Sequence, residues 1–377
     1  MRYFILSGEA SGDLHGSNLV KELKRLDTSA IVKGWGGNKM QDQGVEILKH
    51  YKELAFMGFA EVLLNIRKIA NNFKLCKSQV LEFKPDVLIL IDYPGFNLRM
   101  AKWAKENKIK VFYYISPSVW AWKESRVEIV RKYVDKMFVI LPFEKPFYAK
   151  HGIDVVFEGN PLWDAIESEK EKQVNRDDFS RKHGLSNKPL IAVLPGSRKQ
   201  EISGMLPLMS KIQKKFPNYE FVIAGTSIFP LAYYQQYLQS DEIKVIFDDT
   251  HALMRQAHSG IIKSGTSTLE SAIYNLPQLV CYKGSAISIW IASKVAKVKF
   301  ISLPNLILNE PVLTELIQNE FNEEKLIYYL ELLVSDSDYR KKILSDYDRL
   351  RKLLGGPGAS FRVAETMIKL LNSSGRE

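Results

Sequence analysis

The residues of this chain that most clearly suggest chemistry form one glycine-rich loop, Ser7–Asp13 (SGEASGD), directly after the apolar run Tyr3–Leu6. A turn of this kind before a helix lets a ligand approach the backbone, and the helix N-terminus adds N–H donors and partial positive charge. Glu9 and Asp13 add carboxylates, which favour a hydroxyl-rich ligand such as a sugar. The spacing is not G-x-G-x-x-G, so it does not indicate a dinucleotide site. The alternative is that Asp13 only caps the helix and Glu9 faces water.

A second glycine turn in the later half of the chain has the residue types of a phosphate site. Leu194–Arg198 (LPGSR) ends an apolar run and precedes a helical pattern. Gly196 permits close backbone approach, while Ser197 and Arg198 offer a hydroxyl and a guanidinium to an anion. Taken alone, the motif is also compatible with an ordinary tight turn.

A third loop, Lys263–Glu270 (KSGTSTLE), again lies between an apolar run and a helical pattern. The amides and hydroxyls of Gly265, Thr266 and Ser267 suit a diphosphate at a helix N-terminus. Glu270 comes one turn later, where it can accept hydrogen bonds from ribose hydroxyls. Two such loops in one half of the chain predict a nucleotide diphosphate as ligand.

Asp92 is the candidate for proton transfer. It begins the segment DYPGFN at the end of the most apolar run, Val87–Ile91, and an acid at the carboxyl edge of a strand is placed to act as a general base. Its alternative role is to cap a loop before a proline turn. Ile115–Trp122 (ISPSVWAW) follows the next strand-like run, and Trp120 and Trp122 form either a packed aromatic loop or a wall for a sugar or an acyl chain.

The remaining patterns predict an α/β protein with two domains. Uninterrupted Val/Ile/Leu runs alternate with helical segments, which indicates parallel strands buried on both faces. We expect two doubly wound, Rossmann-like domains facing across a cleft, at residues 1–162 and 163–356, with two polar helices at the end of the chain. The break Gly355–Gly358 separates the second of these, at about 358–372.

Bulk composition narrows the class of protein. The 377 residues include 46% hydrophobic residues, enough for two cores, and only two cysteines, which fits a reducing cytoplasm. We expect no signal peptide and no membrane span, because the first apolar run leads directly into a structured motif and none approaches ~20 residues. The net charge of +10 favours an anionic partner, but the basic residues are dispersed, so nucleic acid is not expected.

Two amphipathic segments are candidates for membrane contact. Residues 59–73 carry an apolar helical stripe beside basic residues, and residues 287–299 combine Trp290 with several lysines. Ordinary packing helices give similar patterns. Phe56 and Met57, just before the first segment, and Phe59, its first residue, are further candidates for contact with acyl chains or a membrane.

A metal site is not expected. Asp336-Ser337-Asp338 and Asp346-Tyr347-Asp348 match D-x-D by letter, but both lie in the polar helical tail, where a solvated helix face is the simpler explanation. The six histidines show no ligand spacing.

Several of these segments, in this order, closely resemble the lipid-A-disaccharide synthase family of GT-B glycosyltransferases. A last helix that crosses back to the first domain is usual for such enzymes, so the resemblance implies this course for the helix at about 358–372. The similarity covers about the first 310 residues and is carried by Ser7–Asp13, Phe56–Val62, Ile91–Asn97, Ser116–Trp122, Leu141–Glu144, Leu194–Arg198, Ser264–Glu270 and Ser302–Asn305.

The resemblance implies an inverting, metal-independent transfer of diacylglucosamine from UDP to 2,3-diacylglucosamine 1-phosphate. The product is the β-1,6-linked precursor of lipid A, made peripherally on the inner face of the cytoplasmic membrane. Asp92 would be the base, Glu9 would orient sugar hydroxyls, and Asn305 would contact the diphosphate or the sugar.

This chain departs from the family pattern at two positions. Gly95 stands where many members carry a second acid, which concentrates the general-base role on Asp92, and Asn160 stands where the family often has His. Three alternatives remain at this point: another GT-B transferase acting on a different lipid, a UDP-N-acetylglucosamine 2-epimerase, and a non-catalytic nucleotide-sugar sensor.

Overall fold

The computed structural model describes residues 1–54, 66–117, 119–122, 126–168, 174–240, 242–284 and 299–373. The chain divides into two units: Met1–Ser168 with Leu354–Glu377, and Glu169–Leu353. The sequence-based boundaries, 162/163 and about 356, differ from these by a few residues, since helix α9 (Leu162–Glu167) belongs to the first unit.

The first unit is built on a seven-stranded parallel sheet in the order β3-β2-β1-β4-β5-β6-β7. Tyr3 of β1 is in register with Val32 of β2 on one side and Val87 of β4 on the other. The strand order reverses between β1 and β4, and ligands of such sheets bind at the carboxyl ends beside this switch point. The strands are β1 (Arg2–Ser7), β2 (Ile31–Gly36), β3 (Glu46–His50), β4 (Val87–Ile91), β5 (Val111–Tyr114), β6 (Lys136–Val139) and β7 (Val155–Phe157).

Helices connect these strands, as the alternating pattern predicts. Those of the first unit are α1 (Ala10–Leu26), α2 (Asn38–Asp42), the 3-10 turn η1 (Tyr51–Glu53), α4 (Ile66–Phe83), α5 (Pro94–Glu106), α6 (Val119–Trp122), α7 (Val127–Tyr133), α8 (Glu144–Lys150), α9 and α19 (Ala359–Ser373).

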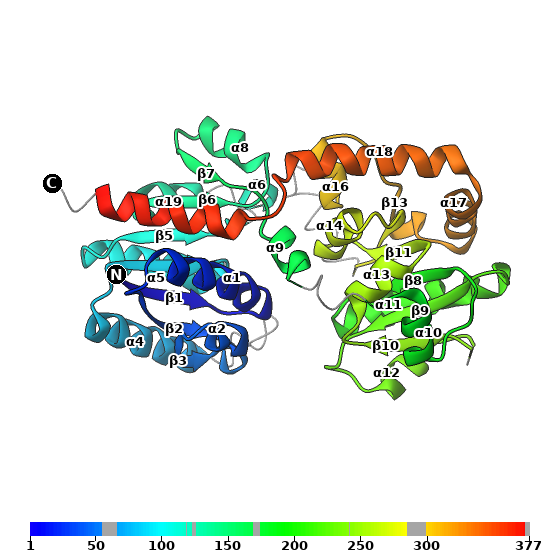
Figure 1. Ribbon diagram of the computed structural model, residues 1–377, viewed down its shortest axis with the longest axis horizontal. Helices are drawn as coiled ribbons and strands as arrows, with labels where there is room; N and C mark the ends of the chain where they lie inside the picture. Colours follow the sequence, from blue (N-terminus) through cyan, green and yellow to red (C-terminus); the bar gives the residue numbers. More distant parts are fainter. Residues whose placement is uncertain are drawn as a thin grey trace. The chain divides into compact units, whose positions relative to one another are not determined.

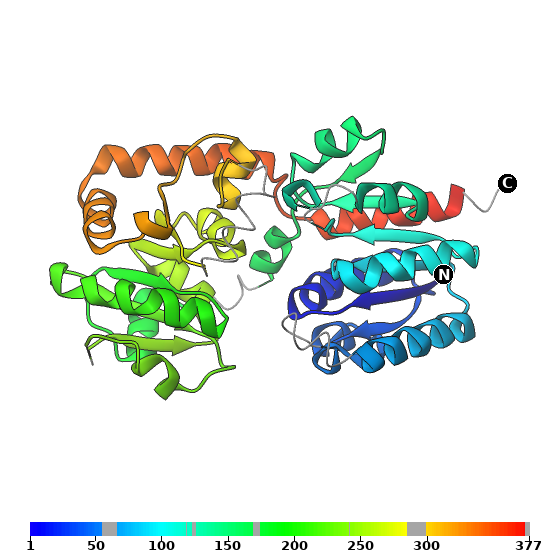
Figure 2. The ribbon, with the colours of Figure 1, turned by 180° about the vertical axis from the view of Figure 1, so that it is seen from behind.

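Strand β4 shows why the sheet is covered on both faces. All five of its side chains are apolar and fully buried. Leu88 and Leu90 pack in the cluster that includes residues of α4 and α5, whereas Ile89 and Ile91 pack in the cluster of α1 and α19. Figure 1 shows α1 and α19 on the near side, and the half turn to Figure 2 brings α5 to the front.

The last helix, α19, lies against α1 in the first unit (Figure 1), although more than 330 residues separate the two in sequence. The expectation that this helix is polar is wrong: Val363, Ala364 and Met367 are buried against the sheet in the cluster that holds Leu19 and Leu23. The predicted break is confirmed, since α18 ends at Leu353 and three glycines of the next five residues have positive φ angles.

The second unit has a six-stranded parallel sheet in the order β10-β9-β8-β11-β12-β13. Its first strand, β8, again lies beside its fourth, β11, so the switch point recurs. The strands are β8 (Leu190–Leu194), β9 (Glu220–Gly225), β10 (Lys244–Phe247), β11 (Ser259–Lys263), β12 (Gln278–Tyr282) and β13 (Glu315–Ile317). The helices are α10 (Arg176–His183), α11 (Lys199–Lys211), η4 (Ile212–Lys215), α12 (Leu231–Gln235), α13 (Thr250–Gln256), α14 (Thr266–Ile273), α16 (Leu303–Leu308), η5 (Gln318–Glu320), α17 (Glu323–Ser335) and α18 (Ser337–Leu353).

Candidate functional site

In the first unit, Asp92 lies where β4 meets α5, at the switch point. Asp92 and Tyr93 have φ angles of 43° and 47°, in the left-handed region that costs L-residues energy. Two side chains clamp this backbone: Asn97 Nδ2 donates to the carbonyls of Ile91 (3.1 Å) and Asp92 (2.8 Å), and the Tyr113 hydroxyl donates to the Asp92 carbonyl at 2.6 Å. Strained backbone held by its surroundings is typical of functional sites.

The electrostatics of Asp92 suit a general base. Burial and the nearby charge of Glu9 raise the pKa of the Asp92 carboxyl from 3.8 to about 6, against a hydrogen bond from the Tyr93 backbone. A base titrating near neutral pH is a stronger proton acceptor than an ordinary aspartate while still being ionised at pH 7. The arrangement can therefore deprotonate a hydroxyl.

The loop after β1 lies against the loop after β4. A Cβ atom on Gly8 would come within 2.4 Å of the Tyr93 ring, so only glycine permits this contact. Glu9 is exposed at the start of α1 and makes no side-chain capping bond there. The structure thus brings two predicted site residues, Glu9 and Asp92, to one end of the sheet.

Asp13 has a different role from either one considered from the sequence. Its buried carboxylate accepts hydrogen bonds from the backbone N–H groups of Gly37 (2.7 Å), Lys39 (3.1 Å) and Met40 (3.1 Å). Gly37 is the N-cap residue of α2, and Lys39 and Met40 lie in its first turn, so Asp13 caps α2 rather than its own helix. Because the Asp13 carboxylate is occupied by these hydrogen bonds, Glu9 is the carboxylate of this turn that is available to bind a ligand.

Glu144, the last residue of the segment Leu141–Glu144, is a buried acid for which the sequence predicted no role. Only 1% of it is exposed, and its carboxylate accepts from the backbone N–H groups of Ile140 (3.1 Å) and Leu141 (2.9 Å) at the end of β6. Burial raises the pKa of Glu144 to about 7, despite those bonds. Ser116 and Tyr148 share a 2.8 Å hydrogen bond close by.

Among the candidates for contact with acyl chains or a membrane, the structure describes the side chain of Trp120. Trp120 packs edge-on against Phe143 with ring centres 4.8 Å apart, as expected for a packed aromatic loop. The side chain of Trp122, and Phe56, Met57, Phe59 and Trp290 altogether, lie outside the described residues.

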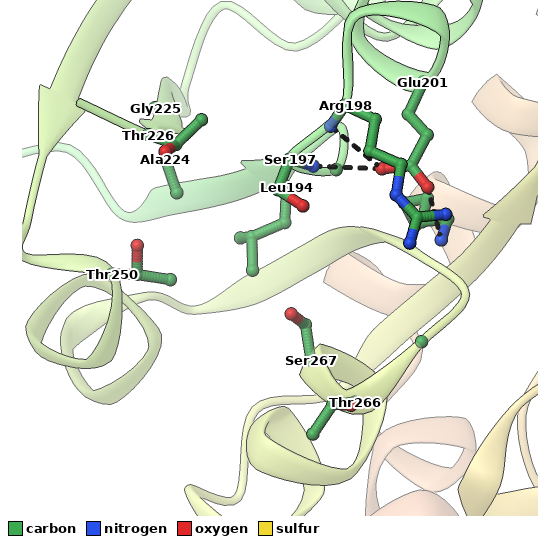
Figure 3. A pocket seen from close by; sticks show the side chains of 13 residues that line it. Leu194, Ser197, Arg198, Glu201, Ala224, Gly225, Thr226, Thr250, Thr266 and Ser267 are labelled. Atoms are coloured by element: carbon green, nitrogen blue, oxygen red, sulfur yellow. Dashed lines mark hydrogen bonds and ion pairs between the residues drawn. The ribbon is translucent and has the colours of Figure 1, made fainter. Parts of the chain in front are cut away.

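In the second unit, the two predicted phosphate loops line one pocket of about 380 Å³. Figure 3 shows the loop after β8 and the start of α14 on opposite sides of it. Six predicted residues line the pocket: Gly196, Ser197, Arg198, Gly265, Thr266 and Ser267. The sequence did not predict seven further lining residues: Leu194, Glu201, Ala224, Gly225, Thr226, Thr250 and Lys263.

Glu201 occupies the inside of the LPGSR turn. Its Oε2 accepts from the backbone N–H groups of Ser197 (3.0 Å) and Arg198 (3.2 Å), and its Oε1 lies 2.8 Å from Lys263 Nζ (Figure 3). Burial opposes ionisation of Glu201, but the Lys263 ammonium and the two amides outweigh it and hold the pKa of this carboxyl below its usual range. The side chains of Ser197 and Arg198 are exposed.

A model of the family described as lipid-A-disaccharide synthetase matches residues 3–365. The chain belongs to this family. The lipid-A-disaccharide synthase of Coxiella burnetii (strain Dugway 5J108-111) is 36% identical over 374 residues, with 98% of each chain covered. That of Trichlorobacter lovleyi is 37% identical over 380 residues, covering 99% of this chain and 98% of the relative.

Solved structures confirm the predicted GT-B fold of this family member. A UDP co-structure of S. aureus MnaA has a TM-score of 0.71 at 14% identity, covering 98% of this chain and 96% of that one. UDP-GlcNAc 2-epimerase from Neisseria meningitidis, bound to UDP-GlcNAc, has a TM-score of 0.70 at 15% identity, covering 98% of this chain and 100% of that one. The calicheamicin glycosyltransferase CalG4 has a TM-score of 0.60 at 14% identity, covering 97% of both chains.

Two residues that the sequence predicted to bind ligand, Glu270 and Asn305, do not line the pocket of the second unit. Glu270 lies one turn into α14 with Oε1 3.6 Å from His251 Nε2, and His251 follows the lining residue Thr250. Asn305 is 1% exposed, and its amide exchanges hydrogen bonds with the backbone of Leu313 and donates to Glu315. The interpretation of Asn305 as a diphosphate or sugar contact therefore gives way to a structural role, because its amide is already bonded inside the unit.

Asn160, the second departure from the family pattern, also has a structural role. Its Nδ2 donates to the Ile140 carbonyl at 3.0 Å, its Oδ1 accepts from the Leu162 N–H at 2.9 Å, and only 3% of it is exposed. It fastens the start of α9 to the end of β6. Gly95, the first departure, is exposed and a Cβ atom there would meet no atom within 4 Å.

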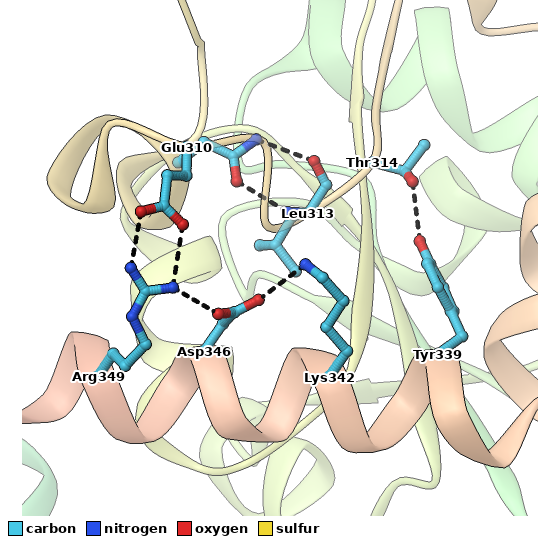
Figure 4. Close-up of polar contacts among 8 residues, drawn as sticks. Glu310, Leu313, Thr314, Tyr339, Lys342, Asp346 and Arg349 are labelled. Atoms are coloured by element: carbon cyan, nitrogen blue, oxygen red, sulfur yellow. Dashed lines mark hydrogen bonds and ion pairs between the residues drawn. The ribbon is translucent and has the colours of Figure 1, made fainter.

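The acidic pairs of the tail are engaged within the second unit. Figure 4 shows Arg349 bonded to Glu310 and Asp346, and Lys342 bonded to Asp346 on α18. Asp336 accepts from the first amides of α18 and so acts as its cap. Within the described part of the chain, no three His, Cys, Asp or Glu side chains gather as metal ligands, and no helix is long and apolar enough to cross a bilayer.

Proposed function

We propose that this protein transfers 2,3-diacylglucosamine from UDP to the 6-hydroxyl of 2,3-diacylglucosamine 1-phosphate. The products are UDP and the β-1,6-linked disaccharide 1-phosphate from which lipid A is made. The observation that carries this proposal is the family match over residues 3–365, which spans both units and both switch points. An acid of raised pKa in one unit and a pocket of phosphate-binding type in the other support it.

Asp92 supplies the base. Its carboxylate takes the proton of the acceptor 6-hydroxyl as that oxygen attacks the anomeric carbon from the face opposite UDP. The new C–O bond forms while the bond to the diphosphate oxygen breaks, and the electron pair leaves with UDP, so the configuration inverts. Glu9 orients sugar hydroxyls, and the desolvation that raises the Asp92 pKa makes the proton transfer more favourable.

The second unit stabilises the leaving diphosphate. The Arg198 guanidinium, the Ser197 hydroxyl and the first N–H groups of α14, at Thr266 and Ser267, are the donors for it. Fixed donors aimed at developing charge contribute roughly 3 kcal/mol each, so no metal ion is needed. Glu270 accepts hydrogen bonds from the ribose hydroxyls.

The substrates carry acyl chains, which suggests a protein that works at the inner face of the cytoplasmic membrane as a peripheral enzyme. The net charge of +10 favours an anionic lipid surface. The proposed contacts with acyl chains or the membrane are the apolar residues Phe56, Met57, Phe59, Trp120, Trp122 and Trp290.

The decisive experiment follows UDP release from UDP-2,3-diacylglucosamine with and without 2,3-diacylglucosamine 1-phosphate. We expect release only when the acceptor is present, with a new disaccharide 1-phosphate by mass spectrometry. UDP-N-acetylglucosamine, which lacks the acyl chains, serves as the matched control donor. Release without acceptor would favour an epimerase or a hydrolase, and no release with either donor would favour a sensor; both results contradict transfer.

A further inference from the structure

The pocket of the second unit contains an anion from the protein itself. Glu201, in the first turn of α11, holds the two amides of the LPGSR turn and the Lys263 ammonium with its two oxygens (Figure 3). Backbone amides after a glycine turn and a lysine are the groups that usually bind phosphate oxygens. Here a carboxylate of the same unit is bonded to them.

The turn is shaped around this carboxylate. Gly196 has a φ angle of 105°, which L side chains rarely adopt, and a Cβ atom there would lie 2.4 Å from Glu201 Oε2. Side chains of 17% exposure for Glu201 and 21% for Lys263 show that the pair is largely withdrawn from water. An ion pair in such surroundings is stronger than one on the surface, since solvent screens it less.

Lys263 also belongs to the second phosphate loop. It is the last residue of β11 and lines the same pocket as Thr266 and Ser267 at the start of α14. A diphosphate bound by those residues is thus a second anion within the same small pocket as the Lys263 ammonium. Two anions that share one cation repel each other, so whichever holds Lys263 weakens the other.

We propose that Glu201 competes with the diphosphate of UDP for Lys263, and that this competition speeds the release of UDP. Lys263 moves from Glu201 to the diphosphate when the nucleotide binds, while Glu201 keeps the amides of Ser197 and Arg198 and so preserves the turn. When UDP departs, Glu201 recaptures Lys263. The proposal rests on the UDP binding proposed above and adds Lys263 as a ligand-binding residue and Glu201 as a positioning residue.

The proposed competition predicts that substitutions of Lys263 and of Glu201 change the affinity for UDP in opposite directions. Lys263→Met removes a charged hydrogen bond to the diphosphate and should weaken UDP binding about 10- to 100-fold. Glu201→Gln keeps the size and an oxygen acceptor for the two amides but removes the negative charge, so UDP binding should become about 10-fold tighter. A purely structural role for the pair would weaken binding in both variants.

The test measures the UDP dissociation constant by calorimetry and the UDP dissociation rate by stopped flow, on the full chain. Glu242→Gln and Lys215→Met, which change exposed residues of the same unit by the same charge, are the matched controls and should leave both constants unchanged. We expect slower UDP release and stronger product inhibition in Glu201→Gln. In the Lys263→Met background, Glu201→Gln should tighten binding much less, because the shared cation is gone.

Each result decides the proposal. Tighter binding with slower release in Glu201→Gln, together with weaker binding in Lys263→Met, supports it. Unchanged or weaker UDP binding in Glu201→Gln, at a melting temperature equal to that of wild type, overturns it while leaving acceptor-dependent transfer intact. If Glu201→Gln has a lower melting temperature than wild type, the same substitution in the Lys263→Met background separates the effect on stability from the effect on UDP binding. An equal increase in UDP affinity in both backgrounds overturns the competition. A wild-type protein that binds no UDP overturns both this inference and the proposed function.

Discussion

The carboxyl ends of the two sheets use the same backbone plan with opposite chemistry. In each unit a glycine turn follows the first strand, a second loop follows the fourth, and the two strands are neighbours. At the first sheet these loops carry Asp92 and Glu9, whereas at the second they carry Arg198 and Lys263 with small hydroxyl residues. The fold therefore supplies a place for a ligand, and the side chains decide which ligand it is.

The two ends also shift pKa values in opposite directions. Asp92 lies in a desolvated position beside another acid, so its pKa rises to about 6. Glu201 is also partly buried, but Lys263 and two amides more than compensate, so its pKa falls. One acid is thus prepared to accept a proton and the other to remain an anion. The following predictions test this difference, from the largest expected effect to the smallest.

Asp92→Asn tests the base. Loss of a general base lowers turnover by about 100- to 10,000-fold, and we expect UDP affinity to remain near the wild-type value because the nucleotide pocket belongs to the other unit. Steady-state kinetics and UDP calorimetry make the measurement, with the exposed Asp42→Asn as a control of equal charge. A variant that keeps more than about a tenth of wild-type turnover would show that Asp92 is not the base.

Arg198→Ala tests the stabilisation of the leaving group. An interaction that strengthens in the transition state lowers kcat when it is removed, here by about 100- to 1,000-fold. The effect on the UDP dissociation constant should be much smaller. Exposed Lys199, the next residue, provides a control through Lys199→Ala. Equal losses in kcat and in UDP affinity would mean that Arg198 binds the nucleotide without favouring the transition state.

Glu270→Gln separates ground-state binding from catalysis. A weakened ribose contact should raise the KM for the donor about 10-fold with little change in kcat, since a lost hydrogen bond to a charged group costs ~1.5–3 kcal/mol. Calorimetry with UDP should show the same loss. Unchanged UDP affinity would refute the ribose role and leave the 3.6 Å contact with His251 as its explanation.

The pH dependence of the free energy of unfolding should show a smaller effect, which is specific to Asp92. Because folding raises the pKa of Asp92 from 3.8 to about 6, the protonated form favours the folded state. That stabilisation is fully present below about pH 4 and is lost as the pH rises through 6. Asp92→Asn should therefore increase the free energy of unfolding at pH 7 by about 1–3 kcal/mol and change it little at pH 4.

Urea titrations of wild type and Asp92→Asn at both pH values make this measurement. The same titration predicts that wild-type kcat/KM rises with pH up to about 6 and then levels off. A variant that is destabilised at pH 7 would contradict the desolvated, functional state assigned to Asp92.

The smallest expected effect is that of removing metal ions. With Arg198 and the N-terminus of α14 assigned to the diphosphate, excess EDTA should leave acceptor-dependent UDP release unchanged. Adding magnesium after EDTA is the control. Activity abolished by EDTA and restored by magnesium would mean that a cation, and not the protein alone, neutralises the leaving group.

Much of the fold follows from local sequence because burial on both faces requires continuous apolar runs. Val87–Ile91, the most apolar run, was predicted as a strand and is β4. The apolar run that ends at Leu194 is likewise a strand, β8. Short or mixed strands such as β2, with a lysine in its middle, and β13, with three residues, were not predicted. Their neighbours in the sheet decide their conformation, and local periodicity does not record which strands are neighbours.

The candidate sites, like the fold, were predictable from the local sequence only in part. Glycine turns between apolar runs and helical patterns determined where each site lies, since parallel strands collect such turns at one edge. Tertiary structure alone decided which polar side chains are available to a ligand. Asp13 caps α2, the Asn305 amide is bonded to Leu313 and Glu315, and Glu201 is paired with Lys263, 62 positions away. The physical reason is that a hydrogen bond or an ion pair depends on distance in space, which the types and spacing of residues along the chain do not specify.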